Sequence, residues 1–371
     1  MSHDYRVLTV HKKDLLMKNG LTTLLLLVVA LTVGCPREAD LVNVSYDPTR
    51  EFYREFNAAF TAHYKEKTGE TKSIRTAHAA SSAQARAVIE GLAADVVTLA
   101  LAFDIDNIAQ RGLLSSDWQQ RLPYNSSPYY STVVFLVRKD NPRNITDWND
   151  LIRPDVSPDV RIVVAHPKTS GVARWAYLAA WGSVLKRELG DDWVNRLHDP
   201  DAAEEVAAAQ REAQNFITAL YRNVAVLPPG ARGASQAFIQ QRQGDVLLDW
   251  ENQAKLTLAE FPDRGYEIVM PSISILAEPP VAVVDRNVDR RGTRELAEAY
   301  LLFLYSEVGQ EIIARHHYRP RNEEVMQRFR NSFAEIELFT VDDVFGGWQQ
   351  AQDKHFSTGG IFDQIYAPGR R

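Results

Sequence analysis

The sequence has very little cysteine and no excess of positive charge. Cys35 is the only cysteine among 371 residues, so no disulfide bond can form within the chain. Lysine and arginine number 42 against 48 aspartate and glutamate residues, which gives a formal net charge of -6. Because contacts to nucleic-acid phosphates usually need a basic surface, this balance argues against a nucleic-acid partner.

Motifs for metal binding and for catalysis are also missing. The nine histidines are scattered, and neither His-Glu-x-x-His nor Gly-x-Ser-x-Gly occurs. A hydrolase that uses Ser81, His78 and Asp47 remains the alternative of another class. We expect no cofactor, no metal and no enzymatic activity.

The N-terminus has the pattern of an export signal rather than of a membrane span. Lys18 and two earlier lysines precede an uncharged run over Leu21–Val33. This run is shorter than the about 20 apolar residues that a spanning helix needs, so we interpret residues 1–39 as a signal peptide. Met17 stands directly before the pattern and is an alternative start to Met1.

Cys35 follows Leu-Thr-Val-Gly, an order similar to a lipobox, in which its thiol would be acylated. Ordinary cleavage nearby, after Ala39, is the alternative. In both cases the mature chain starts near Asp40. The sequence therefore predicts an exported protein, either periplasmic or lipid-anchored on the outer face of the cytoplasmic membrane.

From Leu41 onward, short β-branched or aliphatic runs alternate with amphipathic segments, which is the pattern of an α/β protein. Helices are expected after most of the strands. In the first of them, Phe52, Phe56 and Phe60 recur at helical spacing, and Gly69 ends it. The expected strands are Leu41–Tyr46, Asp95–Ala100, Ser131–Arg138, Arg161–Ala165, Asp245–Asp249, Tyr266–Met270 and Pro280–Val284.

Two turn-rich segments that lead into strands, at 124–128 and 275–278, are expected to cross between two lobes. This division places residues 40–128 and 280–371 in a discontinuous first lobe and residues 129–279 in a second. A cleft between two such lobes suits a small ligand.

Four junctions combine the end of a strand, small or hydroxyl residues and the start of a helix, an arrangement that aims backbone N–H groups at an anion. At the first, Asp47 is the expected N-cap, with Pro48 at the first helical position. At the second, Ser81 and Gln84 match a capping box. Ordinary helix capping explains both junctions equally well.

The other two junctions are more specific. Ser170 and Gly171 let the backbone approach a ligand, and Gly230-Ala231 leads into a helix expected from about Gln236. A strand then ends beside Trp250, whose indole is a donor without an acceptor. Arg174 and Arg232 lie in or near first helical turns, where a cation is unfavourable unless an anion or carboxylate is near.

The sequence resembles the bacterial periplasmic sulfate-binding proteins of sulfate/thiosulfate ABC importers over nearly all of Leu41 to Tyr366. The resemblance implies a type II periplasmic-binding-protein fold with the ligand in the interlobe cleft, and ABC permease subunits as partners of a monomeric binding protein. It depends on Val-Ser-Tyr-Asp-Pro-Thr-Arg-Glu at 44–51, Ala-Asp-Val-Val-Thr-Leu-Ala-Leu-Ala at 94–102, Asp-Trp-Asn-Asp-Leu-Ile at 147–152, Ala-Arg-Trp at 173–175, Gly-Ala-Arg-Gly at 230–233 and Ile-Leu-Ala-Glu-Pro at 275–279.

The same resemblance implies roles for individual residues. The second shell would contain Asp47, with Arg174 as its ionic partner, and Arg232. Val172 departs from the family pattern of a glycine or asparagine, so its backbone donor survives only with a negative φ. The ligand would be held by Ser81, Ser170, Gly171, Val172, Ala231 and Trp250.

A site made only of donors favours sulfate, which has no proton at neutral pH. Phosphate keeps a proton and would place it against a donor, which is costly in a buried site. We therefore expect sulfate as the ligand. Thiosulfate is the chief alternative, and signalling to a membrane sensor is a third reading of the protein's role.

Overall fold

The computed structural model describes residues 39–153 and 160–366. The predicted signal peptide and Cys35 lie outside the described residues, as does a short segment at 154–159. Among the helices of the described part, none is both long enough and apolar enough to cross a membrane. The described chain from Asp40 onward forms one compact unit.

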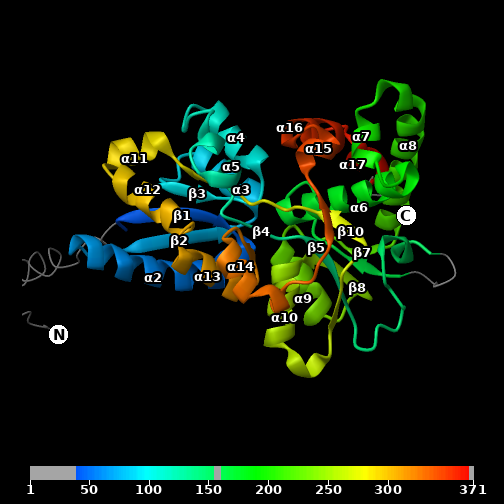
Figure 1. Ribbon diagram of the computed structural model, residues 1–371, viewed down its shortest axis with the longest axis horizontal. Helices are drawn as coiled ribbons and strands as arrows, with labels where there is room; N and C mark the ends of the chain where they lie inside the picture. Colours follow the sequence, from blue (N-terminus) through cyan, green and yellow to red (C-terminus); the bar gives the residue numbers. More distant parts are fainter. Residues whose placement is uncertain (1–38, 154–159, 367–371) are drawn as a thin grey trace, which may run out of the picture. The chain divides into compact units, whose positions relative to one another are not determined.

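The first lobe is built on a four-stranded sheet in the order β11-β3-β1-β2. β1 runs parallel to β2 and β3, whereas β11 is antiparallel to β3. Helices cover this sheet on both sides (Figure 1). The strands are β1 (Leu41–Tyr46), β2 (Ile74–Ala79), β3 (Val96–Thr98) and β11 (Val281–Val283).

The helices of the first lobe follow its strands closely. The α-helices are α2 (Arg50–Thr68), α3 (Ser81–Ile89), α4 (Ala102–Gln110), α5 (Pro123–Ser126), α11 (Asp285–Arg291), α12 (Arg294–Phe303) and α13 (Glu307–Arg315). Two short 3-10 helices, η1 (Asp47–Thr49) and η2 (Trp118–Gln120), complete it.

Helix α2 confirms the aromatic pattern read from the sequence. Phe52, Phe56 and Phe60 are all at most 1% exposed and face the core, and their rings pack on Tyr300 and its neighbours. Gly69 ends the helix in a left-handed conformation with φ 78°, as predicted for a C-terminal glycine. Burial of this face ties α2 to α12 and anchors the first lobe.

The second lobe is built on a five-stranded sheet in the order β7-β6-β8-β5-β9. β6 is parallel to β7 and β8, and β5 is antiparallel to β8 and β9. Each expected strand of this lobe is present. The strands are β5 (Val133–Val137), β6 (Ile162–Val163), β7 (Val224–Val226), β8 (Val246–Trp250) and β9 (Glu267–Val269).

Among the described helices of the second lobe, the long helix α6 is the most deeply buried. α6 is nearly all buried, and α8 packs against it. The α-helices are α6 (Gly171–Leu189), α7 (Trp193–Leu197), α8 (Ala203–Arg222), α9 (Ala231–Ile239) and α10 (Glu251–Glu260), with 3-10 helices η3 (Trp148–Leu151), η5 (Pro200–Ala202) and η6 (Pro262–Arg264).

In the described part of the chain, three segments pass between the lobes, whereas two crossings were expected from the sequence. The two expected crossings pair with each other through a bridge between Ser131 and Ala277. The third crossing begins at β12 (Arg319–Pro320), which pairs with β4 (Tyr129–Tyr130) and leads into α14 (Glu323–Arg328) and the 3-10 helix η7 (Arg330–Ser332).

Arg321 joins all three crossings. Its Nε donates to the Ser127 carbonyl oxygen, its guanidinium binds the Glu278 carboxylate, and the rings of Tyr124 and Tyr130 lie 4.9 and 4.8 Å from its cationic carbon. The side chain is 12% exposed, so these contacts are largely shielded from water. One arginine therefore holds the three crossing segments together.

The C-terminal segment packs on the second lobe. β13 (Glu337–Phe339) pairs with β10 (Ile273–Ile275), and α15 (Val341–Phe345), α16 (Trp348–Ala351), the π-helix η8 (Gln352–Phe356) and α17 (Ile361–Ile365) follow it. α15 contacts α7 and α17 contacts α8, and these elements lie together in Figure 1. This packing departs from the expected boundary, which joined all of 280–371 to the first lobe. We infer that the chain returns to the second lobe at about β13.

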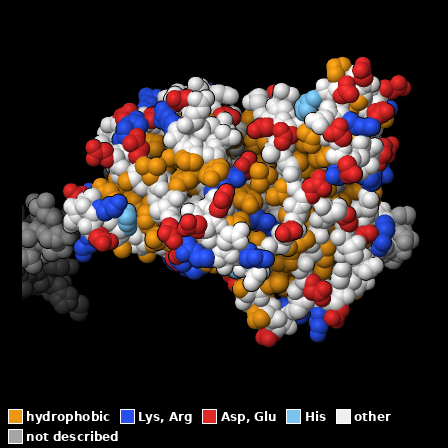
Figure 2. Space-filling model, in the orientation of Figure 1, with side chains coloured by type: hydrophobic (Ala, Val, Ile, Leu, Met, Phe, Trp, Pro, Cys, Tyr) orange, Lys and Arg blue, Asp and Glu red, His pale blue; other side chains and the backbone are white. Residues whose placement is uncertain are grey.

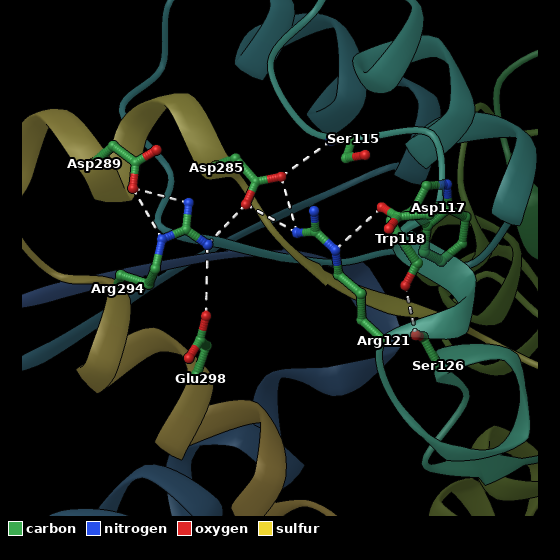
Figure 3. Close-up of polar contacts among 9 residues, drawn as sticks. All are labelled: Ser115, Asp117, Trp118, Arg121, Ser126, Asp285, Asp289, Arg294 and Glu298. Carbon is green, nitrogen blue, oxygen red and sulfur yellow. Dashed lines mark hydrogen bonds and ion pairs between the residues drawn. The ribbon is translucent and has the colours of Figure 1, made fainter.

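An ion-pair cluster ties α11 and α12 to the segment before the first crossing (Figure 3). Asp285 accepts two hydrogen bonds of 2.9 Å from Arg121 and one from Arg294, which also binds Asp289. Partial burial acts to raise the pKa of Asp285, but the donors around it outweigh that effect and hold the pKa below its usual range. The cluster therefore holds the segment around Arg121, which precedes the first crossing, against α11 and α12.

Candidate functional site

In both lobes, helices begin where parallel strands end. β1, β2 and β3 of the first lobe are followed by helices that begin at Asp47, Ser81 and Ala102. β6, β7 and β8 of the second lobe are followed by α6, α9 and α10. Because the first-turn N–H groups of a helix have no acceptor within it, each edge collects unpaired donors.

The edge of the first-lobe sheet where β1, β2 and β3 end faces the edge of the second-lobe sheet where β6, β7 and β8 end. The indole N–H of Trp175, on α6, donates to the Ala100 carbonyl oxygen at 2.9 Å. A Cβ added to Gly171 would lie 2.8 Å from Ala100 Cβ, so the start of α6 touches the segment after β3. The rings of Tyr46 and Trp250 also meet edge to face at 5.7 Å. Donors from both lobes therefore converge on one region.

Trp250 supplies the most unusual donor of this region. It is the last residue of β8 and precedes α10, and its side chain is 0% exposed. Within the described residues, its indole Nε1 is buried and has no hydrogen-bond partner. Buried donors are almost always paired, so this indole N–H is available to an acceptor from outside the chain.

The start of α6 presents three further donors. Ser170 is the N-cap, and its Oγ accepts a hydrogen bond from Ala173 N at 3.4 Å, which leaves the hydroxyl proton for another acceptor. Gly171 and Val172 are the first two helical residues, so their N–H groups have no acceptor within the helix. Val172 has a negative φ, so the valine keeps the backbone donor that its departure from the family pattern put in question.

The start of α9 corrects the sequence prediction. The helix begins at Ala231, not near Gln236, and Gly230 is its extended N-cap with φ -147°. Gly233 lies inside the helix, where a Cβ would meet Pro228 Cβ at 2.9 Å, so the lack of a side chain lets α9 pack closely on this proline. The N–H of Ala231 therefore lies in the first turn, where it has no acceptor within the helix.

Ser81 lies at the start of α3, but the predicted capping box is absent. The cap residue is Ala80, and Gln84 donates to the carbonyl oxygens of Ser45 and Ala77 instead. The capping box is absent because Ser81 is the first helical residue and the cap position holds an alanine, which has no side-chain acceptor.

The Ser81 hydroxyl has two long-range partners. Its Oγ donates to Asp104 Oδ2 at 2.5 Å and accepts from Ala100 N at 3.0 Å. Its proton is therefore already engaged, and Ser81 can offer a ligand only its backbone N–H. Asp104 was not among the predicted residues, and its place in a helix 23 residues away gave no local signal.

The charged residues around the site pair differently from the prediction. Asp47 binds Arg50 at 3.2 Å and is a residue of η1, with Tyr46 as the cap, so the predicted N-cap role is wrong. A carboxylate oxygen of Asp47 lies 3.6 Å from the Cβ position of Gly230. Asp47 thus approaches the start of α9 rather than Arg174.

Arg174 faces Asp104 instead of Asp47. Its Nε donates to the Pro167 carbonyl oxygen at 2.8 Å, and it is 5% exposed. Burial lowers the pKa of Arg174, while the Asp104 carboxylate acts in the opposite direction. Burial raises the pKa of Asp104, and the guanidinium partly offsets that shift. The arginine thus balances a buried carboxylate at the edge of the site.

Arg232 lies at the outer side of the site. Its side chain is 51% exposed, and its guanidinium is 3.6 Å from the Glu51 carboxylate of α2. Such an exposed pair contributes little free energy. Because α9 begins at Ala231, Arg232 lies in its first turn, and the neighbouring Glu51 carboxylate offsets the unfavourable position of a cation there.

The geometry does not assemble the hydrolase alternative. Ser81 bonds to Asp104, whereas His78 Nδ1 lies 3.3 Å from both the Tyr46 carbonyl oxygen and Thr49 Oγ1. Across residues 39–153 and 160–366, no group of three or more His, Cys, Asp or Glu side chains could hold a metal ion.

A water-accessible cavity of about 630 Å³ adjoins the site where the lobes meet. Ser82 and Asp104 line it from the first lobe, and Lys168 and Arg174 line it from the second. Its lining contains both basic and acidic side chains, including Arg86, Arg111 and Glu90.

Comparison with known proteins places the chain in a family. The family model described as bacterial extracellular solute-binding protein matches residues 41–319. A sulfate-binding protein of Escherichia coli (strain K12) is 51% identical over 93% of this chain and 97% of the relative. A thiosulfate-binding protein of Pseudomonas aeruginosa is 44% identical over 92% of this chain and 97% of the relative.

Solved structures agree with the fold. The sulfate-binding protein SubI from Mycobacterium tuberculosis H37Rv superposes with a TM-score of 0.71 at 27% identity, over 85% of this chain and 99% of that one. A ferric binding protein from Campylobacter jejuni, 15% identical, has a TM-score of 0.58 over 88% of this chain and 99% of that one, a likeness of fold alone. The predicted α/β, two-lobed, type II periplasmic-binding-protein fold is confirmed. The chain therefore belongs to the bacterial extracellular solute-binding proteins, and among them to the sulfate-binding protein family.

Proposed function

We propose that this protein captures sulfate outside the cytoplasm and delivers it to the permease of an ABC importer. The observation that carries the proposal is the buried indole N–H of Trp250, which has no partner within the described residues and lies where helix starts converge. An acceptor-rich anion would satisfy it. The names of relatives that are about half identical to this chain support the same ligand.

The donors around Trp250 are numerous enough to bind a dianion without a cation in contact. They are the backbone N–H groups of Ser81, Gly171, Val172 and Ala231, the hydroxyl of Ser170 and the indole of Trp250. Hydrogen bonds to a charged group contribute about 1.5 to 3 kcal/mol each, and each helix start adds a partial positive charge. Together they can exceed the about 8 kcal/mol that micromolar affinity requires.

This donor set favours sulfate over phosphate. Sulfate presents four acceptor oxygens, whereas phosphate at neutral pH keeps a proton that needs an acceptor. Asp47, the carboxylate nearest the start of α9, is already bound by Arg50. A protonated phosphate oxygen would therefore meet a donor, which is costly in a buried site.

Thiosulfate is the second candidate ligand, because relatives that are 44% and 41% identical bear that name. Identity is higher, at 51%, to a relative named for sulfate. The full set of donors supports the same choice, since sulfate offers four oxygen acceptors whereas thiosulfate offers three and one larger, weaker acceptor sulfur.

The remaining proposals concern the setting of the protein. We propose an exported, monomeric binding protein without enzymatic activity, periplasmic or anchored through Cys35, with ABC permease subunits as its partners and no nucleic acid among them. Acidic and basic side chains mix over the face shown in Figure 2, without a continuous basic field. That distribution supports the absence of a nucleic-acid partner.

Isothermal titration of the purified protein with sulfate, thiosulfate, phosphate and molybdate tests this function. We expect tight sulfate binding at a stoichiometry of one, weaker thiosulfate and molybdate binding, and phosphate binding weaker by a hundredfold or more. Equal affinity for sulfate and phosphate would contradict the donor-only site. Tighter binding of thiosulfate than of sulfate would move the assignment to the second candidate.

A further inference from the structure

Asp249 is a buried carboxyl directly behind the proposed oxyanion site. It precedes Trp250 in β8 and is 2% exposed. Its Oδ1 accepts a hydrogen bond of 2.8 Å from the backbone N–H of Trp250. Its Oδ2 lies 3.2 Å from Ser235 Oγ.

Ser235 connects this carboxyl to the start of α9. Its Oγ also lies 3.2 Å from the carbonyl oxygen of Ala231, the first residue of the helix. Asp249 therefore joins Trp250 and the first turn of α9, two of the donors expected to hold the anion. All four residues belong to the second lobe, so the connection does not depend on whether the lobes are closed.

The surroundings of Asp249 do not supply a counter-ion. Within the described part of the chain, no ion pair of Asp249 occurs, and its partner across β5 is Val134. On α10, Glu251 is bound by Arg319 and Lys255. On α9, Arg232 lies beside Glu51, and at η1 Asp47 binds Arg50.

The titratable groups near Asp249 leave it free to change charge. Tyr318 is neutral, because burial raises its pKa and nearby Asp249 adds to that shift. Burial also raises the pKa of Asp249 to about 7, although the hydrogen bonds from Trp250 N and Ser235 act in the opposite direction. The carboxyl is thus divided between its two protonation states near neutral pH.

We propose that Asp249 is a positioning residue of the oxyanion site and that its carboxyl takes up one proton from solvent when the oxyanion binds. This rests on the proposed function. A dianion at Trp250 places negative charge near a buried carboxylate, and like charges favour the protonated form. The bonding pattern accommodates the proton, because protonated Oδ2 can donate to Ser235 Oγ while Ser235 donates to the Ala231 carbonyl oxygen.

The direction in which sulfate affinity changes with pH follows from the coupling between oxyanion binding and proton uptake by Asp249. Oxyanion binding raises the pKa of Asp249, so the protonated protein binds more tightly. Affinity is then full below the pKa of the free protein and falls as pH rises through about 7. The decrease reaches at most about tenfold per pH unit, as expected for one coupled proton.

Titration calorimetry of the full chain with sulfate, in two buffers of different ionisation enthalpy, measures the proton directly. Sulfate itself does not titrate near neutral pH, so any uptake belongs to the protein. We expect uptake that approaches one proton per sulfate above about pH 7 and declines below it. Binding of sulfate without proton uptake would overturn the inference.

Three variants test whether Asp249, rather than another titratable group such as His78 or His166, takes up the proton. Asp249→Asn keeps an acceptor for Trp250 N and should bind sulfate with less than a tenfold change, but without pH dependence and without proton uptake. Asp249→Ala removes both connections and should bind more than tenfold more weakly. Asp245→Asn, which removes a carboxylate beside the opposite end of β8, should behave like the wild type.

The outcomes distinguish this inference from the proposed function. If the wild type fails to bind sulfate at every pH, the proposed function fails and this inference fails with it. If the wild type binds sulfate and Asp249→Asn retains the proton uptake, only the inference is overturned. Thermal unfolding of each variant confirms that it is folded, and the wild-type proton count decides the matter if Asp249→Asn does not fold.

Discussion

The buried indole N–H of Trp250 is the single donor on which the proposed sulfate site depends most. Its ring packs against Tyr46, and its N–H has no partner within the described residues. Trp250→Phe keeps most of the ring and removes only the donor. We expect sulfate binding to weaken by about ten- to a hundredfold, the free energy of one hydrogen bond to a charged group, as measured by titration calorimetry.

Trp118→Phe is the matched control for that substitution. Trp118 is also buried, but its indole N–H donates to Asp106 within the first lobe at 2.9 Å. Its loss should lower the free energy of unfolding without changing sulfate affinity. Equal losses of affinity in the two variants would mean that general destabilisation, rather than the donor, explains the effect.

Some of the helix starts that are proposed to form the site could be predicted from the sequence, because the start of a helix is a local signal. Ser170, Gly171 and Trp250 lie at such starts, as predicted. Partners distant in sequence could not be predicted. Asp104 meets Ser81 across 23 residues, and local spacing does not determine which carboxylate a buried arginine such as Arg174 will face.

At the scale of elements, the approach of α6 to the first lobe depends on a missing side chain. A Cβ on Gly171 would meet Ala100 Cβ at 2.8 Å and Leu101 Cγ at 3.1 Å. Gly171→Ala should therefore hold the two edges apart. We expect a cost of about 1 to 3 kcal/mol in sulfate binding, measured by calorimetry, with little change in the thermal unfolding of the sulfate-free protein.

Gly230→Ala is the comparison for Gly171→Ala. At this N-cap, the nearest atom to an added Cβ is Asp47 Oδ2 at 3.6 Å, an ordinary contact, and the φ of -147° suits any residue. Its sulfate affinity should stay within a few-fold of the wild type. A loss as large as that of Gly171→Ala would show that glycine flexibility, not space, controls these helix starts.

The sequence predicted most of the two main sheets but missed several strands. The seven expected strands are all present, and α2 ends at Gly69 as predicted. β2 was missed because Ile74–Ala79 is only partly buried and reads as polar. Also missed were β4, β7, β10, β12 and β13, which have two or three residues each and lie outside the longer aliphatic runs from which the other strands were read.

At the scale of the whole molecule, the ligand should act as a bridge between the lobes. Donors at the starts of α6 and α9 belong to the second lobe, and the start of α3 belongs to the first. Sulfate at a hundred times its dissociation constant should raise the free energy of unfolding by about 2.7 kcal/mol. Scanning calorimetry measures the shift, and phosphate at the same concentration should produce almost none.

The division into lobes was only partly visible in the sequence. Two crossings were predicted from turn-rich segments, but the third, at β12, lies between ordinary helices and carries no local mark. The return of the C-terminal helices to the second lobe depends on tertiary contacts, such as the edge-to-face packing of Trp175 on Trp348. Periodicity within an element does not say which lobe covers its apolar face.

The hydrogen bond from Trp175 to the Ala100 carbonyl oxygen has a practical consequence. The indole is 1% exposed when the lobes meet, and its bond crosses from α6 to the first lobe. Any movement that parts these edges wets the ring and breaks the bond, which changes its emission spectrum. Trp175 is one of seven tryptophans, so the part of the intrinsic fluorescence change that is absent from Trp175→Phe reports the opening and closing of the protein in stopped-flow experiments.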